Sequence, residues 1–206
     1  MAVILVRHGE TALNAARVLQ PADTPLSERG QVQALAVAQR LARQGGIGAI
    51  LSSDLPRARL TAHAISTALT LPVRPSALLQ ERNFGDLRGR PYDTLGFDPM
   101  IMDTASPGGE SAADFAQRLY AAFDLMLQQH ADQPGDLVVV THGLAIRTLL
   151  AGPLRLDAEL LRDLQLANTS VSIFAAAPPH ALQLLNCTRH LDDDAAPDPA
   201  RSLSGG

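Results

Sequence analysis

Two stretches of the chain, Leu5-Val-Arg-His-Gly9 and Val139-Val-Thr-His-Gly143, share one layout that points to the fold class. Each begins with an apolar run typical of a strand, continues through one polar residue and ends in His-Gly. Continuous rather than alternating apolarity indicates strands covered on both faces, as in a parallel sheet. Both histidines then follow the carboxyl ends of central strands, which is where open α/β sheets bind ligands.

The rest of the chain alternates between strand and helix patterns. Residues 3–6, 47–51 and 137–141 are short apolar runs rich in β-branched residues. Helical spacing occurs at 34–41, behind a candidate cap at Ser27, and at 115–126, which we expect to end at Pro134-Gly135. Residues 169–175 and 181–188 indicate two further strands. The predicted fold class is α/β, a three-layer α/β/α sandwich with a mostly parallel central sheet and an antiparallel edge hairpin.

The pattern predicts one domain over residues 1–191. Within it, residues 83–109 are rich in Gly, Pro and Asp and have no clear period. Loops of this length in a compact domain are usually functional, so we expect a substrate loop or lid there. From 192 to 206 the composition shifts to Asp, Ala, Pro, Ser and Gly, which predicts a disordered tail.

Composition excludes several classes of function. All 17 basic residues are arginine, which rules out Schiff-base chemistry, pyridoxal phosphate anchoring and a phosphate-loop lysine. A net charge of −4 gives no overall positive field for nucleic acid or an anionic membrane, so any anion site must be local. The single cysteine, Cys187, suits a reducing cytosol, and the first residues resemble neither a signal peptide nor a membrane span. We therefore expect a cytoplasmic protein with no nucleic-acid or membrane partner.

A third segment adds an arginine to the two histidines. Residues 51–58 pass from a strand end through Asp54-Leu55-Pro56, which is typical of a helix start, and so put Arg57 in the first helical turn. Metal binding is the first alternative for two histidines at a sheet edge, but Arg7 beside His8 would repel a cation. A phosphate dianion instead needs the planar guanidinium forks of Arg7 and Arg57. These residues favour an anion site that requires no metal.

Four motifs follow one another along the chain: Arg7-His-Gly-Glu-Thr11 with Asn14, Ser53-Asp-Leu-Pro-Arg57-Ala with Thr61-Ala62, Glu81-Arg-Asn-Phe-Gly-Asp-Leu-Arg-Gly89, and Thr141-His-Gly143. In this order they resemble the histidine phosphatase (phosphoglycerate mutase-like) superfamily, in its phosphatase branch, over residues 2–191. Several motifs in one order are far more specific than a single motif.

The resemblance implies a role for each residue of the site and no metal or organic cofactor. His8 would be the nucleophile that becomes phosphohistidine, and Glu81 would donate a proton to the leaving group. The phosphate clamp would consist of Arg7, Arg57 and His142, and further substrate contacts would come from Asn14, Gln20 and Gly143. The chain departs from the family at Gln20-Pro21, where a Gln-Gly pair is common.

The implied function is hydrolysis of small phosphate monoesters by a metal-independent phosphoric monoester hydrolase. Neutral imidazole is a good nucleophile when its other nitrogen donates a hydrogen bond, and a protonated carboxyl helps an alcohol to leave. One alternative is a phosphoglycerate mutase-type phosphoryl transferase, although the lysine and paired arginines of the mutase lid are not recognisable. The other is an inactive phosphate-binding module, which would need neither His8 nor Glu81. The expected partner is a small phosphorylated metabolite of unknown identity, and the sequence leaves a homodimer open.

Overall fold

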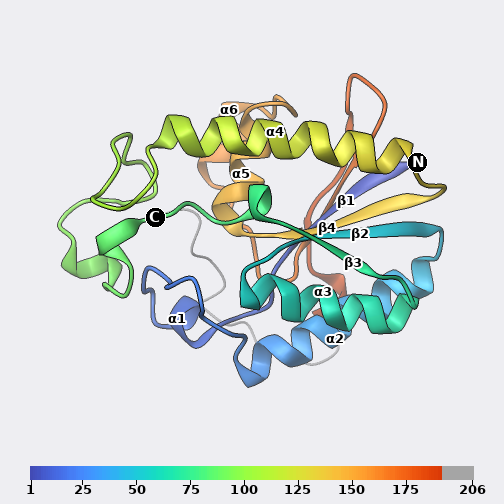
Figure 1. Cartoon of the computed structure of the whole chain (residues 1–206), viewed down its shortest axis with the longest axis horizontal. Helices are drawn as coiled ribbons and strands as arrows, with labels where there is room; N and C mark the ends of the chain where they lie inside the picture. Colours follow the sequence, from blue (N-terminus) through green and yellow to red (C-terminus); the bar gives the residue numbers. More distant parts are fainter. Residues whose placement is uncertain (192–206) are drawn as a thin grey trace.

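A six-stranded sheet runs through the centre of the computed structural model, which describes residues 1–191 (Figure 1). Its order is β3-β2-β4-β1-β5-β6. Four strands are mutually parallel, namely β1 (Ala2–Arg7), β2 (Ile47–Ser53), β3 (Val73–Ser76) and β4 (Asp136–Thr141). Strand β5 (Val171–Ala175) is antiparallel to β1, and β6 (Leu182–Cys187) is antiparallel to β5. The mostly parallel sheet and its antiparallel edge hairpin are thus confirmed, and the predicted tail at 192–206 lies outside the described residues.

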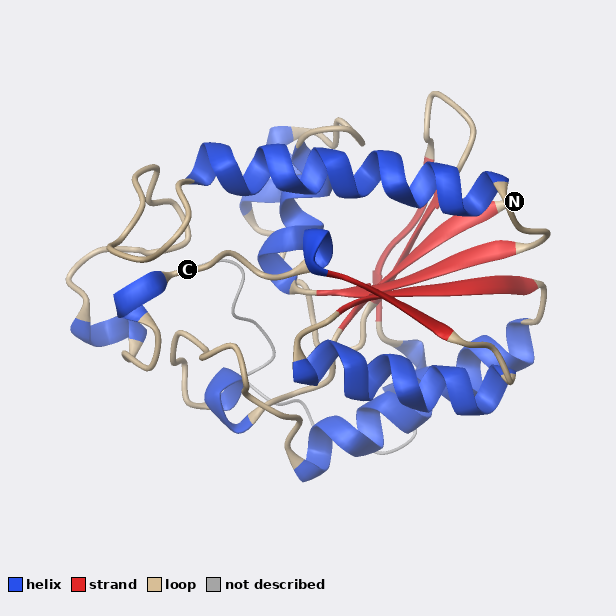
Figure 2. Cartoon of the chain, viewed as in Figure 1, coloured by secondary structure: helices blue, strands red, loops and turns tan. Residues whose placement is uncertain are grey.

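Helices cover both faces of the sheet (Figure 2). Helices α2 (Glu28–Gln44) and α3 (Pro56–Leu69) cover one face, and α4 (Ala112–Ala131), α5 (Gly143–Ala151) and α6 (Ala158–Arg162) lie on the other. Successive side chains of β1 point to opposite faces of the sheet. Ile4 packs in the core under α2 and α3, and Leu5 packs under α4 and α5. Apolar side chains pack on both faces of β1, which explains why its sequence is a continuous apolar run. The three-layer prediction is confirmed.

The helices begin where local chemistry supports a first turn. Ser27 caps α2, since its Oγ accepts the Gly30 N–H at 3.0 Å, and Ser111 caps α4 in the same way. Pro56 is the first residue of α3, as the sequence predicts. The N-cap position of this helix is Leu55, whose side chain makes no capping hydrogen bond. Helix α4 ends at Ala131, a few residues before the predicted Pro134-Gly135.

A close backbone contact joins the start of α2 to the loop after β1. A Cβ on Gly30 would lie 2.0 Å from the carbonyl oxygen of Glu10, so only glycine fits there. Ser27 strengthens the contact, because its hydroxyl donates to the Glu10 carboxylate at 2.8 Å. The loop that leaves the end of β1, beyond His8, therefore rests against a helix terminus.

Strand register brings the site residues to one end of the sheet. Arg7 pairs with Thr141 across β1 and β4, so the next residue of each strand, His8 and His142, emerges at the same level. Strand β2 leads into α3, and β3 leads through a 3-10 turn, Ala77–Leu79, toward Glu81. The sequence analysis did not predict β3, a short edge strand that contains Pro75.

The segment 83–109 covers this end of the sheet, at the left of Figure 1. It contains 3-10 turns at Gly85–Leu87 and Tyr92–Thr94, and a bridge joins Val18 to Pro91. The buried Arg82 side chain holds the segment's far end, since it donates to the carbonyls of Met102 at 2.6 Å and Thr104 at 3.1 Å. The predicted loop therefore has fixed internal contacts.

Candidate active site

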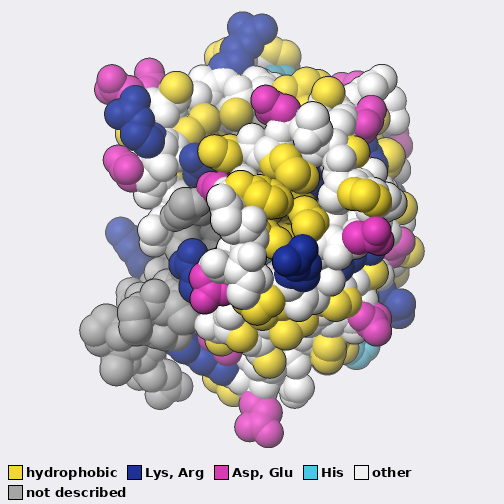
Figure 3. Space-filling view, turned by 90° about the vertical axis from the view of Figure 1, so that its left-hand side faces the viewer, with side chains coloured by type: hydrophobic (Ala, Val, Ile, Leu, Met, Phe, Trp, Pro, Cys, Tyr) yellow, Lys and Arg dark blue, Asp and Glu magenta, His cyan; other side chains and the backbone are white. Residues whose placement is uncertain are grey.

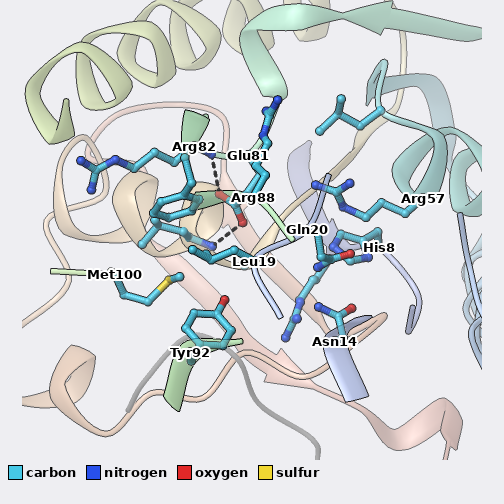
Figure 4. Close-up of a pocket in the computed structure, with 15 residues that line it drawn as sticks. His8, Asn14, Leu19, Gln20, Arg57, Glu81, Arg82, Arg88, Tyr92 and Met100 are labelled. Carbon is cyan, nitrogen blue, oxygen red and sulfur yellow. Dashed lines mark hydrogen bonds between the residues drawn. The ribbon is translucent and has the colours of Figure 1, made fainter. Parts of the chain in front are cut away.

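A pocket lies at the carboxyl ends of the parallel strands, and all but one of the site residues expected from the sequence line it (Figure 4). The exception, His142, lies fully buried behind His8, with the two ring centroids 5.1 Å apart. In Figure 4, His8, Asn14 and Arg57 occupy one side of the pocket, and Glu81 lies across from them. The residues expected in the pocket wall are Arg7, His8, Asn14, Gln20, Arg57, Glu81 and Gly143.

His8 is held as a neutral imidazole with a defined tautomer. Its side chain is buried, and its Nδ1 lies 2.7 Å from the carbonyl oxygen of Gly9, so Nδ1 carries the proton and Nε2 keeps its lone pair. The Gly9 N–H donates to Thr61 Oγ1 at 3.0 Å, which fixes the peptide that accepts this bond. Burial, followed by the charges of Arg57 and Arg7, lowers the pKa of His8 well below its ordinary value.

Arg7 and Arg57 are two buried cations with unused donors. Arg7 donates through Nη1 to the Leu166 carbonyl, and Arg57 donates through Nη1 to the Pro21 carbonyl at 3.3 Å. The Nε of each arginine is buried and has no hydrogen-bond partner among the described residues. Burial lowers the pKa of each to about 10, partly offset by Glu81, so both stay cationic near neutral pH.

His142 adds a third buried nitrogen to this group. It precedes α5, and its Nε2 lies 2.8 Å from Ser53 Oγ at the end of β2. Its Nδ1 is buried without a hydrogen-bond partner in the described part of the chain. Burial, followed by the charge of Arg57, lowers the pKa of His142 well below its ordinary value, so this ring is also neutral.

Two side-chain amides present their NH2 groups at the pocket. The Oδ1 of Asn14 accepts the Thr11 N–H and the amide of Asn168, both at 3.3 Å. The Oε1 of Gln20 accepts the hydroxyl of Thr11 at 2.8 Å. Because both carbonyl oxygens are engaged, the groups left for the pocket are donors. Gln20 therefore lines the site although proline follows it.

Glu81 is the only acidic residue among those lining the pocket. Its two carboxylate oxygens accept backbone N–H groups, from Arg82 at 3.1 Å and from Leu144 at 3.1 Å (Figure 4). Removal of the carboxyl from water raises the pKa of Glu81, and this effect exceeds the opposing ones of the two hydrogen bonds and of Arg57 and Arg7. The carboxyl is thereby shifted toward its protonated form.

The remaining wall comes from residues that sequence reasoning did not single out for the site. The 83–109 segment was expected to contact substrate as a whole, but no pattern within it indicated which side chains would do so. Figure 3 shows this end of the molecule, where hydrophobic side chains gather beside a basic one. The additional wall residues are Leu19, Leu55, Arg82, Phe84, Arg88, Tyr92, Met100 and Leu144.

Residues 1–191 lack two features, a metal-binding cluster and a membrane-spanning helix. No group of three or more His, Cys, Asp or Glu side chains in this range could hold a metal ion. Within the same residues, no helix has the length and apolar character needed to span a membrane.

Comparisons with known proteins agree on one family. A sequence model described as the histidine phosphatase superfamily (branch 1) matches residues 3–188. The chain is 41% identical over 180 residues, 82% of each chain, to a protein named probable phosphoglycerate mutase GpmB of Yersinia pestis.

Solved structures of the same fold include three named phosphatases. A phosphoserine phosphatase of Entamoeba histolytica, solved as a mutant with phosphoserine, has a TM-score of 0.77 and 28% identity over 92% of this chain and 98% of its own. A mycobacterial glucosyl-3-phosphoglycerate phosphatase has a TM-score of 0.72 and 29% identity over 84% and 90%. The alpha-ribazole phosphatase of Shigella flexneri has a TM-score of 0.78 and 25% identity over 91% and 97%.

Proposed function

The chain belongs to the histidine phosphatase superfamily, branch 1, and we propose that it hydrolyses small phosphate monoesters by passing the phosphoryl group through His8 to water. One observation carries this proposal: the buried, unpartnered nitrogens of the described chain include Arg7 Nε, Arg57 Nε and His142 Nδ1 around one imidazole. Each such polar atom costs about 1–3 kcal/mol when buried without a partner. The oxygens of a bound phosphate would offset that cost.

In the first step, Nε2 of His8 attacks phosphorus while the bond to the ester oxygen breaks. The Nδ1–H bond to the Gly9 carbonyl keeps the lone pair on Nε2 and stabilises the imidazolium that forms. Glu81 gives its proton to the departing oxygen, so the alcohol leaves neutral and a phosphohistidine and a carboxylate remain. The raised pKa of Glu81 supports this role as general acid.

In the second step, water attacks the phosphohistidine and the bond from Nε2 to phosphorus breaks. The Glu81 carboxylate takes the proton of the attacking water, which restores the starting protonation of the site. Inorganic phosphate is the product. In both steps Arg7, Arg57 and His142 stabilise the charge on the equatorial oxygens, and no metal takes part.

Other polar groups of the wall would complete the phosphate site. The NH2 groups of Asn14 and Gln20 are directed to the pocket as donors, because their carbonyl oxygens are already bonded. Gly143 lies in the first turn of α5, where backbone N–H groups and the helix dipole favour an anion. The site is thus composed of donors and cations, with Glu81 as the exception.

The 41% identity to a protein named as a probable mutase gives a second candidate, phosphoglycerate mutase activity. A mutase would return the phosphoryl group of His8 to the organic product instead of to water. Incubation with 3-phosphoglycerate separates the two, because hydrolysis releases inorganic phosphate and isomerisation forms 2-phosphoglycerate. A cytoplasmic location and a homodimer remain predictions.

The experiment that tests the proposal uses His8→Ala and the matched control His63→Ala, whose side chain is exposed on α3. Acid quench of wild type during turnover of a 32P-labelled ester should leave an acid-labile phosphoryl group on the protein. We expect His8→Ala to fold, to lose this label and to lose turnover, while the control keeps both. Substantial turnover by His8→Ala would show that another group is the nucleophile. Absence of turnover in wild type with every phosphorylated metabolite screened would favour the inactive binding module.

A further inference from the structure

Arg88 is the arginine of the pocket wall that has neither a role in the proposed chemistry nor a side-chain hydrogen bond within residues 1–191. Four arginines line the pocket: Arg7, Arg57, Arg82 and Arg88. Arg7 and Arg57 face the proposed phosphate site. The guanidinium of Arg82 donates hydrogen bonds to the carbonyls of Met102, Thr104 and Glu110. The guanidinium of Arg88 has no hydrogen-bond or ion-pair partner among residues 1–191.

The backbone that carries Arg88 is well held. Its own N–H donates to the Gly85 carbonyl at 3.1 Å, and the Gly89 N–H donates to the Leu19 carbonyl at 2.6 Å. Two residues before Arg88, the Asp86 N–H donates to the Pro107 carbonyl at 3.0 Å. A half-buried, unpartnered cation thus extends from a fixed turn into the pocket, which is a geometry suited to recognition of an anion.

The position of Arg88 places it near the organic part of a substrate. In Figure 4 it lies beside Glu81, across the pocket from His8. Glu81 would protonate the leaving oxygen, so this side of the pocket receives the leaving group. Arg88 also lowers the pKa of Arg57, which shows that the two cations repel each other across the pocket. An anionic group beside Arg88 would relieve that repulsion.

Most other wall residues on this side are uncharged. Leu19, Phe84, Met100 and Leu144 supply apolar surface, and Tyr92 supplies a hydroxyl that burial keeps protonated by raising its pKa. A single guanidinium matches one carboxylate through two parallel hydrogen bonds. A second phosphate dianion would call for several cations, as at Arg7 and Arg57.

We propose that Arg88 determines specificity by binding a carboxylate on the leaving group, so that the substrate is the phosphate monoester of a small hydroxy acid. This inference rests on the proposed function. It assigns Arg88 to the organic half of the substrate, whereas Arg7 and Arg57 serve the phosphoryl group that every ester shares.

The experiment compares two esters that differ in the carboxylate alone, 3-phosphoglycerate and glycerol 3-phosphate. We expect Arg88→Gln to lower kcat/KM for 3-phosphoglycerate by about 10- to 100-fold, mainly through KM, and that for glycerol 3-phosphate by less than about threefold. Arg88→Lys should be intermediate, because it keeps the charge but loses the bidentate fork. Arg90→Gln is the matched control, since Arg90 is exposed, lies two residues away and is outside the pocket wall.

Equal losses on both esters would overturn the assignment, because they would place Arg88 at the shared phosphate. No loss on either ester would also overturn it. If wild type hydrolyses neither ester, turnover does not test Arg88, and calorimetric binding to His8→Ala protein tests it instead. Tighter binding of 3-phosphoglycerate than of glycerol 3-phosphate, removed by adding Arg88→Gln, supports the carboxylate site. Equal affinities overturn it.

Discussion

Burial shifts the pKa values of the site histidines and of Glu81 in opposite directions. His8 and His142 are kept neutral by burial and by adjacent arginines, so neither carries a positive charge that would block attack on phosphorus. The pKa of Glu81 is shifted the other way, toward the protonated form. A nucleophile and an acid with separated pKa values are what a two-step phosphoryl transfer needs.

Replacement of Glu81 by glutamine tests the acid role. The amide cannot donate a proton to the leaving oxygen, so we expect kcat/KM for alkyl phosphates to fall by roughly 10²–10⁴-fold. With p-nitrophenyl phosphate the loss should be below about tenfold, because its phenolate leaves with little protonic help. Glu28→Gln, at an exposed position of α2, is the control. Equal losses on both classes of ester would contradict the assignment, provided that dephosphorylation does not limit the rate.

The buried histidines also predict how stability depends on pH. In the unfolded chain each titrates near 6.5, whereas in the folded chain the pKa of both is lower. The unfolded state therefore binds more protons below pH 6.5, and the free energy of unfolding falls as the pH drops toward the folded pKa. The expected slope is about 1.4 kcal/mol per pH unit for each histidine.

Urea unfolding of wild type and His8→Ala between pH 6.5 and about 5 isolates one of these contributions. Because Glu81 and His142 are present in both proteins, we expect the wild-type slope to be steeper by the share of one histidine. His63→Ala, which removes an exposed imidazole, should keep the wild-type slope. Identical slopes for wild type and His8→Ala would mean that His8 is protonated in the folded protein over this range.

Among the secondary-structure elements, α4 positions Glu81 through one side chain. Arg118 Nη1 donates to the Gln80 carbonyl at 3.0 Å, and Nη2 donates to the Glu81 carbonyl at 3.4 Å. Its Nε pairs with Glu110 at 2.7 Å, and the other carboxylate oxygen of Glu110 accepts the Asn83 N–H at 3.0 Å. The ion pair thus holds the chain on both sides of the Glu81 carboxyl.

Arg118→Met keeps an unbranched apolar stem but removes these hydrogen bonds. We expect the free energy of unfolding to fall by about 2 kcal/mol, because Glu110 and several carbonyls lose a charged donor that is only partly exposed. A positioning role for Arg118 further predicts that alkyl phosphates lose more activity than p-nitrophenyl phosphate, as with Glu81→Gln. Arg43→Met, at the exposed end of α2, is the control. If stability falls and the activity toward both classes of ester falls equally, Arg118 has only a structural role.

For the molecule as a whole, the cationic site belongs to an acidic chain. The net charge is −4, yet the pocket wall carries four arginines and one glutamate. Attraction of the substrate phosphate is therefore assigned to local contacts with buried guanidinium groups rather than to the overall field. In the proposed mechanism these groups would supply the positive charge that a metal ion provides in other phosphatases.

Chelation and anion inhibition test this charge assignment. EDTA should leave kcat/KM unchanged, because Arg7 and Arg57 supply the charge at the phosphoryl group. Vanadate and inorganic phosphate should inhibit competitively, since they would occupy the same donors. Activity that EDTA removes and a divalent ion restores would contradict the metal-free mechanism.

Local spacing in the sequence was sufficient for the layered fold and for the main site residues. Apolar runs of strand length, each followed by His-Gly or by a helix start, predict strands whose carboxyl ends share one edge. Because parallel strands align their ends, His8, Arg57 and His142 could be expected to meet. Their roles, and that of Glu81, came from the resemblance to a family and remain proposals.

The tertiary structure alone revealed the contacts that join distant segments. The backbone beside Arg88 and Tyr92 is held at the pocket because the Gly89 N–H donates to the Leu19 carbonyl and the Tyr92 N–H donates to the Arg17 carbonyl, about 70 residues earlier in the chain. No short-range pattern encodes such bonds. Likewise, Arg118 contacts the Glu81 carbonyl across 37 residues. Strand β3 escaped detection because it has only four residues and is held by pairing with β2 rather than by its own propensity. Burial also depends on the whole fold, so the pKa shifts of His8 and Glu81 could not be inferred from sequence.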